Sequence, residues 1–534
     1  MTTTTEIKAA AEKGRIARAA GLVSAMTLVS RLLGLLREQV FAILLGAGVY
    51  SDAFRIGFRV PNLLRDLFAE GALSAAFVPT YARVSKEAGQ AEAFRLANRV
   101  LSLLAALLGA LVLLGIVYAG PLVAALAPGF EKVAGKTELT VLLTRIMMPF
   151  LPLVSFAAVA MGMLNAEERF AMPALSPALF NVVTIGWAGV LWAMGLPPEK
   201  VAVGWAVGTL LGGLAQFLCQ VPSLWRAGWR PRLEWAPLDP ALGRMARLMA
   251  PATVGLAAVQ VNIFVNSIFA SHEPGAVSWL NYAFRILYLP IGVFGVAVGT
   301  IATTGLARRA AAGDWDGLKQ TLRQSIQMVA FLTIPSTVGL VVLRRPIVAL
   351  LYQRGRFGPE DVEQTATALA VYSLGLVAYT GVKVLAPAFY ALGLPRVPLL
   401  ASVCAVATNL LINMTLYRTL GFRSVALGTA LAALVNALIL AAVFERRLGG
   451  LRSRRLFGSL VRMLVAAAAM AATAWSCVRL LAPHAAPGLA GQSLLGIGPV
   501  AVGAVTYLMA ARVLQLPEAS ELFGLLRRRF RPAS

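Results

Sequence analysis

The chain has 534 residues, of which 58% are hydrophobic and 13% are charged, and its mean hydropathy is +0.75. Soluble globular proteins are about 25% charged, so this composition excludes a soluble enzyme. Lysine and arginine number 48 against 24 aspartates and glutamates, which gives a formal net charge of +24. The meaning of that excess depends on where in the chain it lies.

Apolar runs long enough to cross a bilayer, which takes roughly 20 helical residues, recur along the whole chain. Clear examples cover residues 101–118, 140–164, 201–218, 328–343, 425–444 and 463–481. Together with weaker runs interrupted by glycine or proline, they predict about 12 to 14 transmembrane helices, because helices satisfy their own backbone groups in lipid. The longest polar stretch, roughly 225–247, is a loop with a short amphipathic piece, which leaves no room for a soluble catalytic domain.

The cysteines and histidines predict neither a disulfide nor a metal site. Cys219, Cys404 and Cys477 lie far apart in apolar sequence, as small buried hydrophobic residues do. His272 and His484 fall in separate loops without the spacing of metal ligands. We therefore expect no metal and no cofactor.

The N-terminus superficially resembles a signal peptide, since basic residues precede an apolar run over 19–30. Arg31 interrupts that run and no small-residue cleavage site follows, so we interpret 1–18 as a cytoplasmic basic tail before a retained helix. If later spans alternate, about 30 basic residues fall in inner loops and about 10 in outer loops, which places both termini in the cytoplasm. Topology and anionic lipid then explain most of the charge, and no nucleic-acid partner is needed.

Eight basic residues remain within or near the hydrophobic depth, where charges are costly and normally face a bundle interior or a watery cavity. They are Arg31, Arg37, Arg55, Arg59, Arg65, Arg145, Arg285 and Lys383. Arg145, beside an outer loop, is expected to extend to the interface. Gly34 and Pro61 are expected to bend the helices that carry them.

One stripe of a helix, at about 100° per residue, carries a series of polar side chains and must face something polar. The stripe consists of Asp52, Arg55, Arg59, Asn62, Asp66 and Glu70. Two interpretations stay open. In the first, the three acids only neutralise the three arginines of the same segment.

In the second interpretation the cluster binds an anion. Four further cations remain: Arg31, Arg37, Arg285 and Lys383. Glu38 is their only nearby acidic candidate. A cationic surplus in a cavity favours an anionic ligand, and the planar fork of arginine suits phosphate oxygens.

A short internal repeat indicates duplication. The sequence Ala53-Phe54-Arg55-Ile56, with Pro61 following, recurs 230 residues later as Ala283-Phe284-Arg285-Ile286, with Pro290 following. If six spans separate equivalent points, the two halves form a parallel repeat with a site at its interface, as in transporters. Arg55 and Arg285 are then expected to face each other.

The same segments closely resemble the MurJ/MviN lipid II flippase family, over essentially the full chain. The motifs are Ser30-Arg31-x-x-Gly34-x-x-Arg37, Gly46-Ala47-Gly48, Asp52-Ala53-Phe54, Pro61-Asn62-Leu63-Leu64-Arg65, Phe68-Ala69-Glu70-Gly71-Ala72, Ala76-Phe77-Val78-Pro79, Ser278-Trp279, Arg285, 292–299 and Lys383-Val384-Leu385-Ala386-Pro387-x-Phe389-Tyr390.

The resemblance implies an all-α polytopic membrane protein of the multidrug/oligosaccharidyl-lipid/polysaccharide exporter superfamily, with about 14 transmembrane helices. Two six-helix lobes in parallel repeat would form a V around a cationic cavity, and two C-terminal helices would add a groove for a lipid tail. The expected boundaries are a basic tail (1–18), an N-lobe (19–230, helices 1–6), a C-lobe (231–450, helices 7–12), a helix pair (451–516, helices 13–14) and a second basic tail (517–534).

The resemblance also implies a transporter and not an enzyme. Its substrate would be lipid II, the undecaprenyl-pyrophosphate-linked disaccharide-pentapeptide of peptidoglycan biosynthesis, moved by alternating access from the inner to the outer leaflet of the bacterial cytoplasmic (inner) membrane. That activity serves cell wall biogenesis and cell shape. Expected partners are lipid II and membrane lipids, with the cell-wall synthesis machinery as a further candidate, and we expect a monomer.

Carried over motif by motif, two sets of site residues are implied. Substrate-binding positions are Arg31, Arg37, Arg59, Arg65, Arg285 and Lys383; gating or ion-pair positions are Glu38, Asp52, Arg55, Asp66 and Glu70. The chain departs from the family pattern at Phe284 and Tyr288, which are often acidic in relatives, and at Asp66, where a second basic residue is frequent. Charge pairing around Arg285 is therefore expected to differ.

Three alternatives compete with this interpretation. A flippase for another polyprenyl-linked oligosaccharide shares the same features, whereas a cationic-drug exporter needs carboxylates in place of the arginine surplus. A membrane-embedded glycan polymerase needs a catalytic acid in a sizeable outer loop, and the outer loops here are short. The coupling ion stays open: Asn409 and Asn413, in an apolar span, are interpreted as helix-packing residues, with ion ligation as the alternative.

Overall fold

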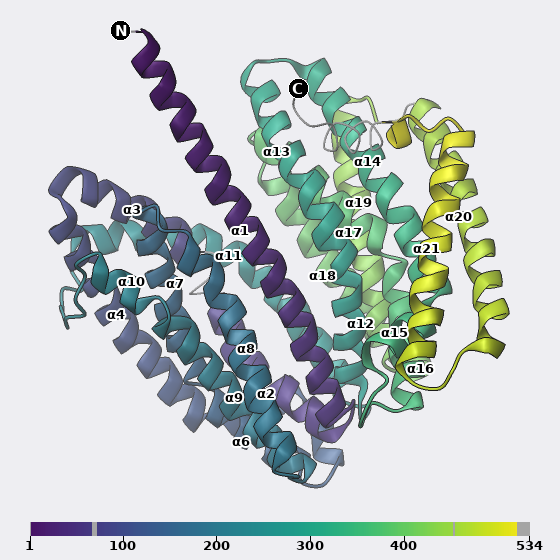
Figure 1. Ribbon diagram of the computed structural model, residues 1–534, viewed down its shortest axis with the longest axis horizontal. Helices are drawn as coiled ribbons and strands as arrows, with labels where there is room; N and C mark the ends of the chain where they lie inside the picture. Colours follow the sequence, from purple (N-terminus) through teal and green to yellow (C-terminus); the bar gives the residue numbers. More distant parts are fainter. Residues whose placement is uncertain (1, 67–71, 452–453, 521–534) are drawn as a thin grey trace. The chain divides into compact units, whose positions relative to one another are not determined.

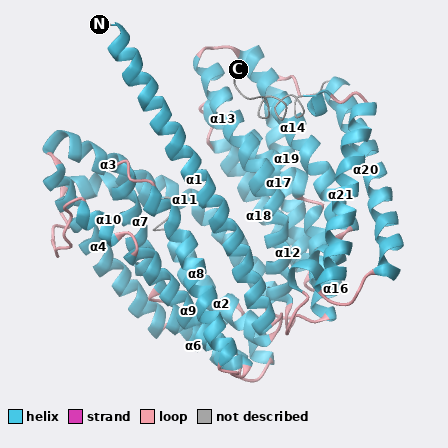
Figure 2. Cartoon of the chain, viewed as in Figure 1, coloured by secondary structure: helices cyan, strands magenta, loops and turns pink. Residues whose placement is uncertain are grey.

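The computed structural model describes residues 2–66, 72–451 and 454–520, and all regular secondary structure in them is helical (Figures 1 and 2). The chain divides into two compact units, Met1–Gly275 and Ala276–Ser534. This agrees with the prediction of an all-α polytopic protein.

The first unit contains eleven α-helices and one short 3₁₀ helix among its described residues. In chain order they are α1 (Thr2–Leu45), α2 (Val49–Arg65), α3 (Ala72–Ala88), α4 (Gln90–Val117), α5 (Ala119–Leu126), η2 (Pro128–Lys132), α6 (Lys136–Met147), α7 (Phe150–Ala166), α8 (Ala171–Ala193), α9 (Pro198–Leu218), α10 (Val221–Arg226) and α11 (Pro240–Ala270). Helix α1 packs on α8, α8 on α9, and α2 on α6. Helix α3 lies against α4, α7 and α11, so α11 is part of this unit although the expected lobe boundary falls at 230/231.

The second unit begins with α12 (Ala276–Pro290) and the π-helical segment η3 (Ile291–Gly295). It continues with α13 (Val296–Ala311), α14 (Trp315–Val342), α15 (Arg344–Tyr352), α16 (Pro359–Ser373), α17 (Leu376–Ala391), α18 (Arg396–Leu420), α19 (Arg423–Leu448), α20 (Arg454–Leu481), η4 (Ala482–His484) and α21 (Leu489–Val513). Helices α20 and α21 pack on each other, and α20 also packs on α14 (Figure 1).

The described residues contain ten helical segments that are long and apolar enough to cross a membrane, or eleven if the bent pair α16–α17 forms one span. Helices α1 and α11 and the pair α2–α3 are the remaining long elements, and they carry more charged or polar side chains. Counted with the eleven, they bring the total to about 14, the number the sequence predicts. The chain is a multi-pass membrane protein.

The helix boundaries support the internal repeat. Helix α14 begins at Trp315, 225 residues after Gln90 of α4, and α18 begins at Arg396, 225 residues after Ala171 of α8. The series α4 to α9 thus has a counterpart in α14 to α19, element by element.

The same spacing changes the pairing of the repeated arginines. Helix α12 begins at Ala276, 227 residues after Val49 of α2. An offset of 226 residues aligns Phe58-Arg59-Val60 with Phe284-Arg285-Ile286 and makes Arg59 the counterpart of Arg285. The 230-residue offset of the sequence repeat instead makes Arg55 the counterpart.

The two positions expected to bend their helices both lie inside continuous helices. Helix α1 is continuous through Gly34, and α2 continues past Pro61 to Arg65. A side-chain carbon added at Gly34 would make an ordinary contact, 3.7 Å from the side chain of Asn181 on α8.

Candidate functional site

The predicted charge cluster lies on the hairpin formed by α1 and α2. Gly46 adopts a left-handed conformation (φ 64°) directly after α1, as the predicted Gly46-Ala47-Gly48 turn requires. Ser51 closes the turn, because its hydroxyl accepts a hydrogen bond from the backbone N–H of Gly48 at 2.8 Å. The hairpin brings Glu38 of α1 beside Arg55 of α2, 17 residues away in sequence.

Glu38 is buried and holds two arginines. One carboxylate oxygen accepts from Arg37 at 3.1 Å and the other from Arg55 at 3.4 Å. The Arg37 side chain is 21% exposed and that of Arg55 is 7% exposed, so Arg37 is the more accessible of the two.

Aromatic rings enclose this trio. The Arg37 guanidinium lies 5.1 Å from the centre of the Phe180 ring, and that of Arg55 lies 5.0 Å from the Phe41 ring. Ring faces attract guanidinium groups, so each ring adds a favourable contact for one arginine of the trio. Trp205 packs edge-on against Phe41.

Asp52 has a different set of partners from those the sequence predicts. Its side chain is completely buried, and Oδ2 accepts from Lys136 Nζ at 2.8 Å and from the backbone N–H of Gly275 at 2.7 Å. Lys136 is also completely buried and lies 4.0 Å from the centre of the Phe130 ring. Asp52 therefore joins α2 to the start of α6 and to the end of the first unit.

Lys136 is the site residue that sequence reasoning missed. The topology prediction places Lys136 among the roughly 10 basic residues of the outer loops, because it follows Gly135 at the start of an apolar run. Its proximity to Asp52 depends on the packing of α2 on α6, across 84 residues of sequence. The one available signal is the position of a lysine immediately before a membrane span, opposite an acid in another span.

A third charged cluster lies at the end of α2. Arg65 donates to Asp66 Oδ1 through Nη2 at 2.9 Å, and Gln260 of α11 donates to Asp66 Oδ2 at 3.2 Å. Asp66, at a position where the resemblance implies a basic residue, thus pairs with Arg65.

The comparisons with known proteins decide the family. The model of the family described as "Lipid II flippase MurJ" matches residues 41–489. A probable lipid II flippase MurJ of Vibrio cholerae is 34% identical over 520 residues, which cover 95% of this chain and 98% of that protein. The chain belongs to the lipid II flippase MurJ family.

Other members of the MurJ family match similarly. A probable lipid II flippase MurJ of Rhizobium meliloti is 35% identical over 92% of both chains, and a lipid II flippase MurJ of Burkholderia cenocepacia is 36% identical over 79% of this chain and 82% of that protein.

A solved structure of a lipid II flippase MurJ in an inward closed conformation superposes with a TM-score of 0.75 at 24% identity and covers 92% of this chain and 98% of that one. An inward-facing multidrug resistance MATE transporter of the MOP superfamily follows with a TM-score of 0.66 at 19% identity, over 81% of this chain and 99% of that one. These two likenesses support the fold.

In the second unit, Phe284, at a position where the resemblance implies an acid, packs among aromatic rings. The Phe284 ring packs edge-on on Tyr372 and Tyr379, with ring centres 5.5 and 6.3 Å apart, and also lies near Tyr288. Arg285 is half-buried on α12.

The remaining predicted residues have simple placements. Arg31 on α1 and Lys383 on α17 are exposed, and Arg59 on α2 is half-buried. Glu70 lies outside the described residues. The structure thus gathers Arg37, Glu38 and Arg55 in one cluster, places Asp52 in a second and joins Arg65 to Asp66 in a third.

Asn409 and Asn413 make the contacts expected of helix-packing residues. Asn413 donates to the backbone carbonyl and to the side-chain oxygen of Asn409 at 2.9 and 3.0 Å, and Ser424 of α19 donates to Asn413 at 3.2 Å. Both asparagines are completely buried. Within the described ranges, no group of three or more His, Cys, Asp or Glu side chains has the arrangement of a metal site.

Proposed function

We propose that the chain is a lipid II flippase, which moves undecaprenyl-pyrophosphate-linked disaccharide-pentapeptide from the inner to the outer leaflet of the cytoplasmic membrane. The observation that carries this proposal is the alignment of 95% of the chain with a probable lipid II flippase at 34% identity. The family is one of transporters, and we propose that the chain catalyses no covalent step.

The charge balance of the hairpin supports an anionic substrate. Residues 30–66 contain five arginines and three acids, and one of those acids, Asp52, already accepts from Lys136. This part of the chain therefore carries more arginines than acids. Guanidinium groups bind phosphate oxygens in a bidentate manner, which suits a pyrophosphate.

Arg37 and Arg55 differ in the part they can play. We propose that a pyrophosphate displaces Glu38 from the more accessible Arg37, while the buried Arg55 retains Glu38. The carboxylate then stays paired in both states, which avoids the cost of an isolated buried charge. Arg31, Arg59, Arg65, Arg285 and Lys383 are proposed as further cations on the path of the headgroup.

The lipid tail stays in the bilayer in this proposal. Removing tens of CH₂ groups from lipid would cost about 0.8 kcal/mol each, so a flippase moves the polar headgroup and leaves the chain in hydrocarbon. We propose alternating access for the headgroup and cytoplasmic termini for the chain. We further propose that the protein acts as a monomer.

Rescue of bacterial cells tests the function. Expression of this chain in cells depleted of their own lipid II flippase is expected to sustain growth without lysis. Lysis at normal expression and normal membrane insertion of the chain would count against the proposal.

The headgroup site has its own test. Arg37→Gln and Arg285→Gln are each expected to abolish lipid II translocation while the protein still inserts and keeps its thermal-unfolding midpoint. Arg145→Gln is the matched control, because Arg145 is exposed and donates only outside the cluster, to the Ile116 carbonyl at 3.2 Å. Normal translocation by the Arg37→Gln variant would show that Arg37 is not part of the headgroup site.

A further inference from the structure

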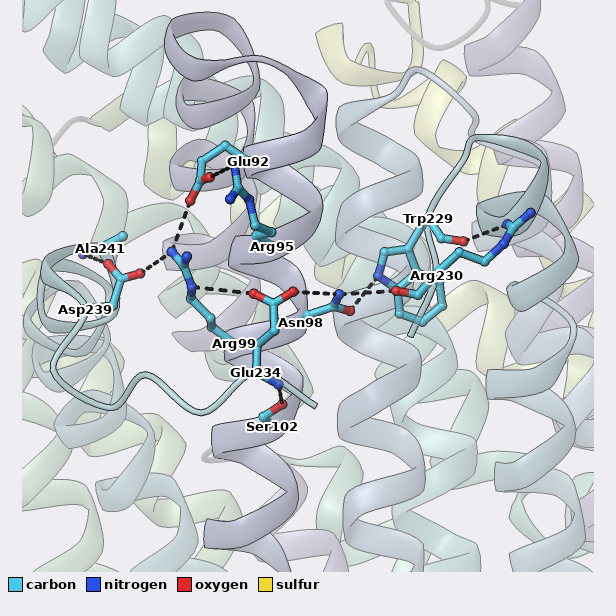
Figure 3. A network of polar contacts seen from close by, with 10 residues as sticks. All are labelled: Glu92, Arg95, Asn98, Arg99, Ser102, Trp229, Arg230, Glu234, Asp239 and Ala241. Atoms are coloured by element: carbon cyan, nitrogen blue, oxygen red, sulfur yellow. Dashed lines mark hydrogen bonds and ion pairs between the residues drawn. The ribbon is translucent and has the colours of Figure 1, made fainter. Parts of the chain in front are cut away.

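The connection between α10 and α11, residues 227–239, is fixed to α4 by side chains; we call it the strap (Figure 3). Trp229 Nε1 donates to Asn98 Oδ1 at 2.9 Å, and Asn98 Nδ2 donates to the Arg230 carbonyl at 3.2 Å. Further along, the backbone N–H of Glu234 donates to the Ser102 hydroxyl at 3.0 Å. The strap therefore has a defined position along α4.

Both acids of the strap are held by one arginine of α4. Arg99 lies 2.7 Å from Asp239 and 3.7 Å from Glu234, and it also contacts Glu92 at 3.1 Å (Figure 3). Asp239 additionally accepts from the backbone N–H of Ala241 and so caps α11. The negative charge of the strap is thus turned toward α4.

The outward surface of the strap and its flanks is basic and apolar. Exposed arginines are Arg226, Arg230, Arg232, Arg244 and Arg247. Between them, Leu233 is 86% exposed, Trp235 63% and Leu238 95%. Large apolar side chains exposed among cations are typical of segments that lie at a membrane surface.

The position of the strap on α4 sets its depth. Asn98 and Ser102 are buried beneath it, and one turn beyond Ser102 an exposed apolar stripe of α4 begins at Ala106 and continues through Ala110, Leu113 and Val117, all exposed. Each four-residue step advances about 6 Å along the helix. The strap therefore ends one helical turn from the start of an exposed apolar stripe that is suited to lipid.

We propose that the strap docks on the headgroup region of an anionic lipid leaflet, with Leu233, Trp235 and Leu238 inserted at the boundary with the acyl chains and the arginines on lipid phosphates. Tryptophan prefers this depth, and basic side chains beside a membrane are attracted to anionic lipid. The direct continuation of the strap into the apolar stripe of α4 favours lipid over a protein partner. The inference requires only that α4 spans the membrane, and it is independent of the transported substrate.

The depth of residue 235 tests the proposal. The full chain, with Cys219, Cys404 and Cys477 changed to alanine and Trp235→Cys labelled with the apolar fluorophore NBD, is reconstituted in nanodiscs of phosphatidylglycerol and phosphatidylcholine. The matched control is Ala88→Cys, the exposed last residue of α3, next to the start of α4, which lies about 18 Å along that helix from Ser102. We expect blue-shifted emission and several-fold stronger quenching by lipid-borne nitroxides at 235 than at 88. Leu238→Cys repeats the measurement if the first variant does not fold.

A second experiment tests the contribution of the arginines. Arg230→Gln with Arg232→Gln is expected to lower the ratio of docked to undocked strap about 25-fold, because each cation near an anionic surface contributes about a fivefold effect. Replacing phosphatidylglycerol by phosphatidylcholine should act in the same direction. Equal quenching at 235 and 88 overturns the proposal. A probe at 235 that is shielded only in cell-derived membranes overturns it in favour of a protein partner.

Discussion

At the scale of single residues, buried ion pairs determine which charges are available to a substrate. Asp52 and Lys136 are both completely buried, 2.8 Å apart. A buried pair adds little net stability, but removing one partner leaves an uncompensated charge. We infer that the pair holds α2 against α6, and that Lys136 is therefore not available to bind an anion.

Lys136→Met is accordingly expected to destabilise the protein by about 3 kcal/mol or more. The exposed Lys132 of the same loop gives the control Lys132→Met, for which we expect almost no change. Adding Asp52→Asn to Lys136→Met should recover part of the loss, because no buried charge then lacks a partner. Thermal unfolding of the purified protein in detergent measures all three variants, and equal midpoints for the two lysine variants would contradict the assignment.

A carboxylate between spans predicts a pH dependence. Asp314 caps α14 by accepting from the Gly317 N–H at 2.9 Å and pairs with Arg309 at 2.6 Å. The hydrogen bond from Gly317, followed by the contact with Arg309, lowers the pKa of Asp314 below its ordinary value. The stability that the Asp314 carboxylate contributes to the start of α14 is therefore complete above the ordinary carboxyl pKa. It is lost as the pH falls through the lowered pKa. We expect a lower hydrogen-exchange protection factor at Gly317, the ratio of the intrinsic to the observed exchange rate, in Asp314→Ala at neutral pH, and little further change of that factor in the variant on acidification.

At the scale of helices, close packing of α2 on α6 positions the arginines of α2. A side-chain carbon added at Gly57 would lie 3.2 Å from Leu143, Thr144 and Met147 of α6. Small residues at such contacts allow helices in a membrane to approach closely. The orientation of Arg55 and Arg59 thus depends on the close approach of α2 to α6 at Gly57.

Gly57→Leu is therefore expected to reduce translocation strongly and to lower the unfolding midpoint, because overpacking costs about 1–3 kcal/mol. Gly34→Ala is the control, since the nearest atom to its added carbon is 3.7 Å away, an ordinary contact. Both variants are compared by translocation assay and thermal unfolding. Similar losses in both would show that α2–α6 packing has no special role.

At the scale of the whole molecule, composition and span spacing were sufficient to predict an all-α membrane protein with about 12 to 14 helices. The pattern of the stripe also predicted that its side chains face something polar, and Asp52 and Arg55 contact charged side chains. Sequence spacing did not predict the partners of these residues. Glu38 reaches Arg55 through the Gly46 turn, and Lys136 reaches Asp52 through helix packing, so both contacts depend on tertiary structure.

The register of the repeat was also beyond the sequence alone. Four matching letters selected Arg55 as the partner of Arg285, whereas the helix boundaries select Arg59. A short identical run is a weak guide because arginine and phenylalanine each occur twice within six residues of α2. Element lengths over a whole unit give a more reliable alignment.

The positive-inside rule makes a prediction about orientation. Reporter fusions at Ser534 and in the loop after Gly313 should report the cytoplasm, and fusions at Gly195 and Gly488 the opposite side. Cysteine labelling from outside the cell gives an independent measurement. Reversed signals at Gly195 and Gly313 would contradict the proposed topology.

The location of lipid II tests the central claim most directly. In cells depleted of their own flippase, the fraction of lipid II accessible from the outer leaflet is measured with and without this chain. We predict that the chain restores the accessible fraction and that its Arg37→Gln variant leaves lipid II accumulated in the inner leaflet. An unchanged inner-leaflet pool in the presence of the correctly inserted chain, or restored transport of a different polyprenyl-linked oligosaccharide alone, would contradict the account.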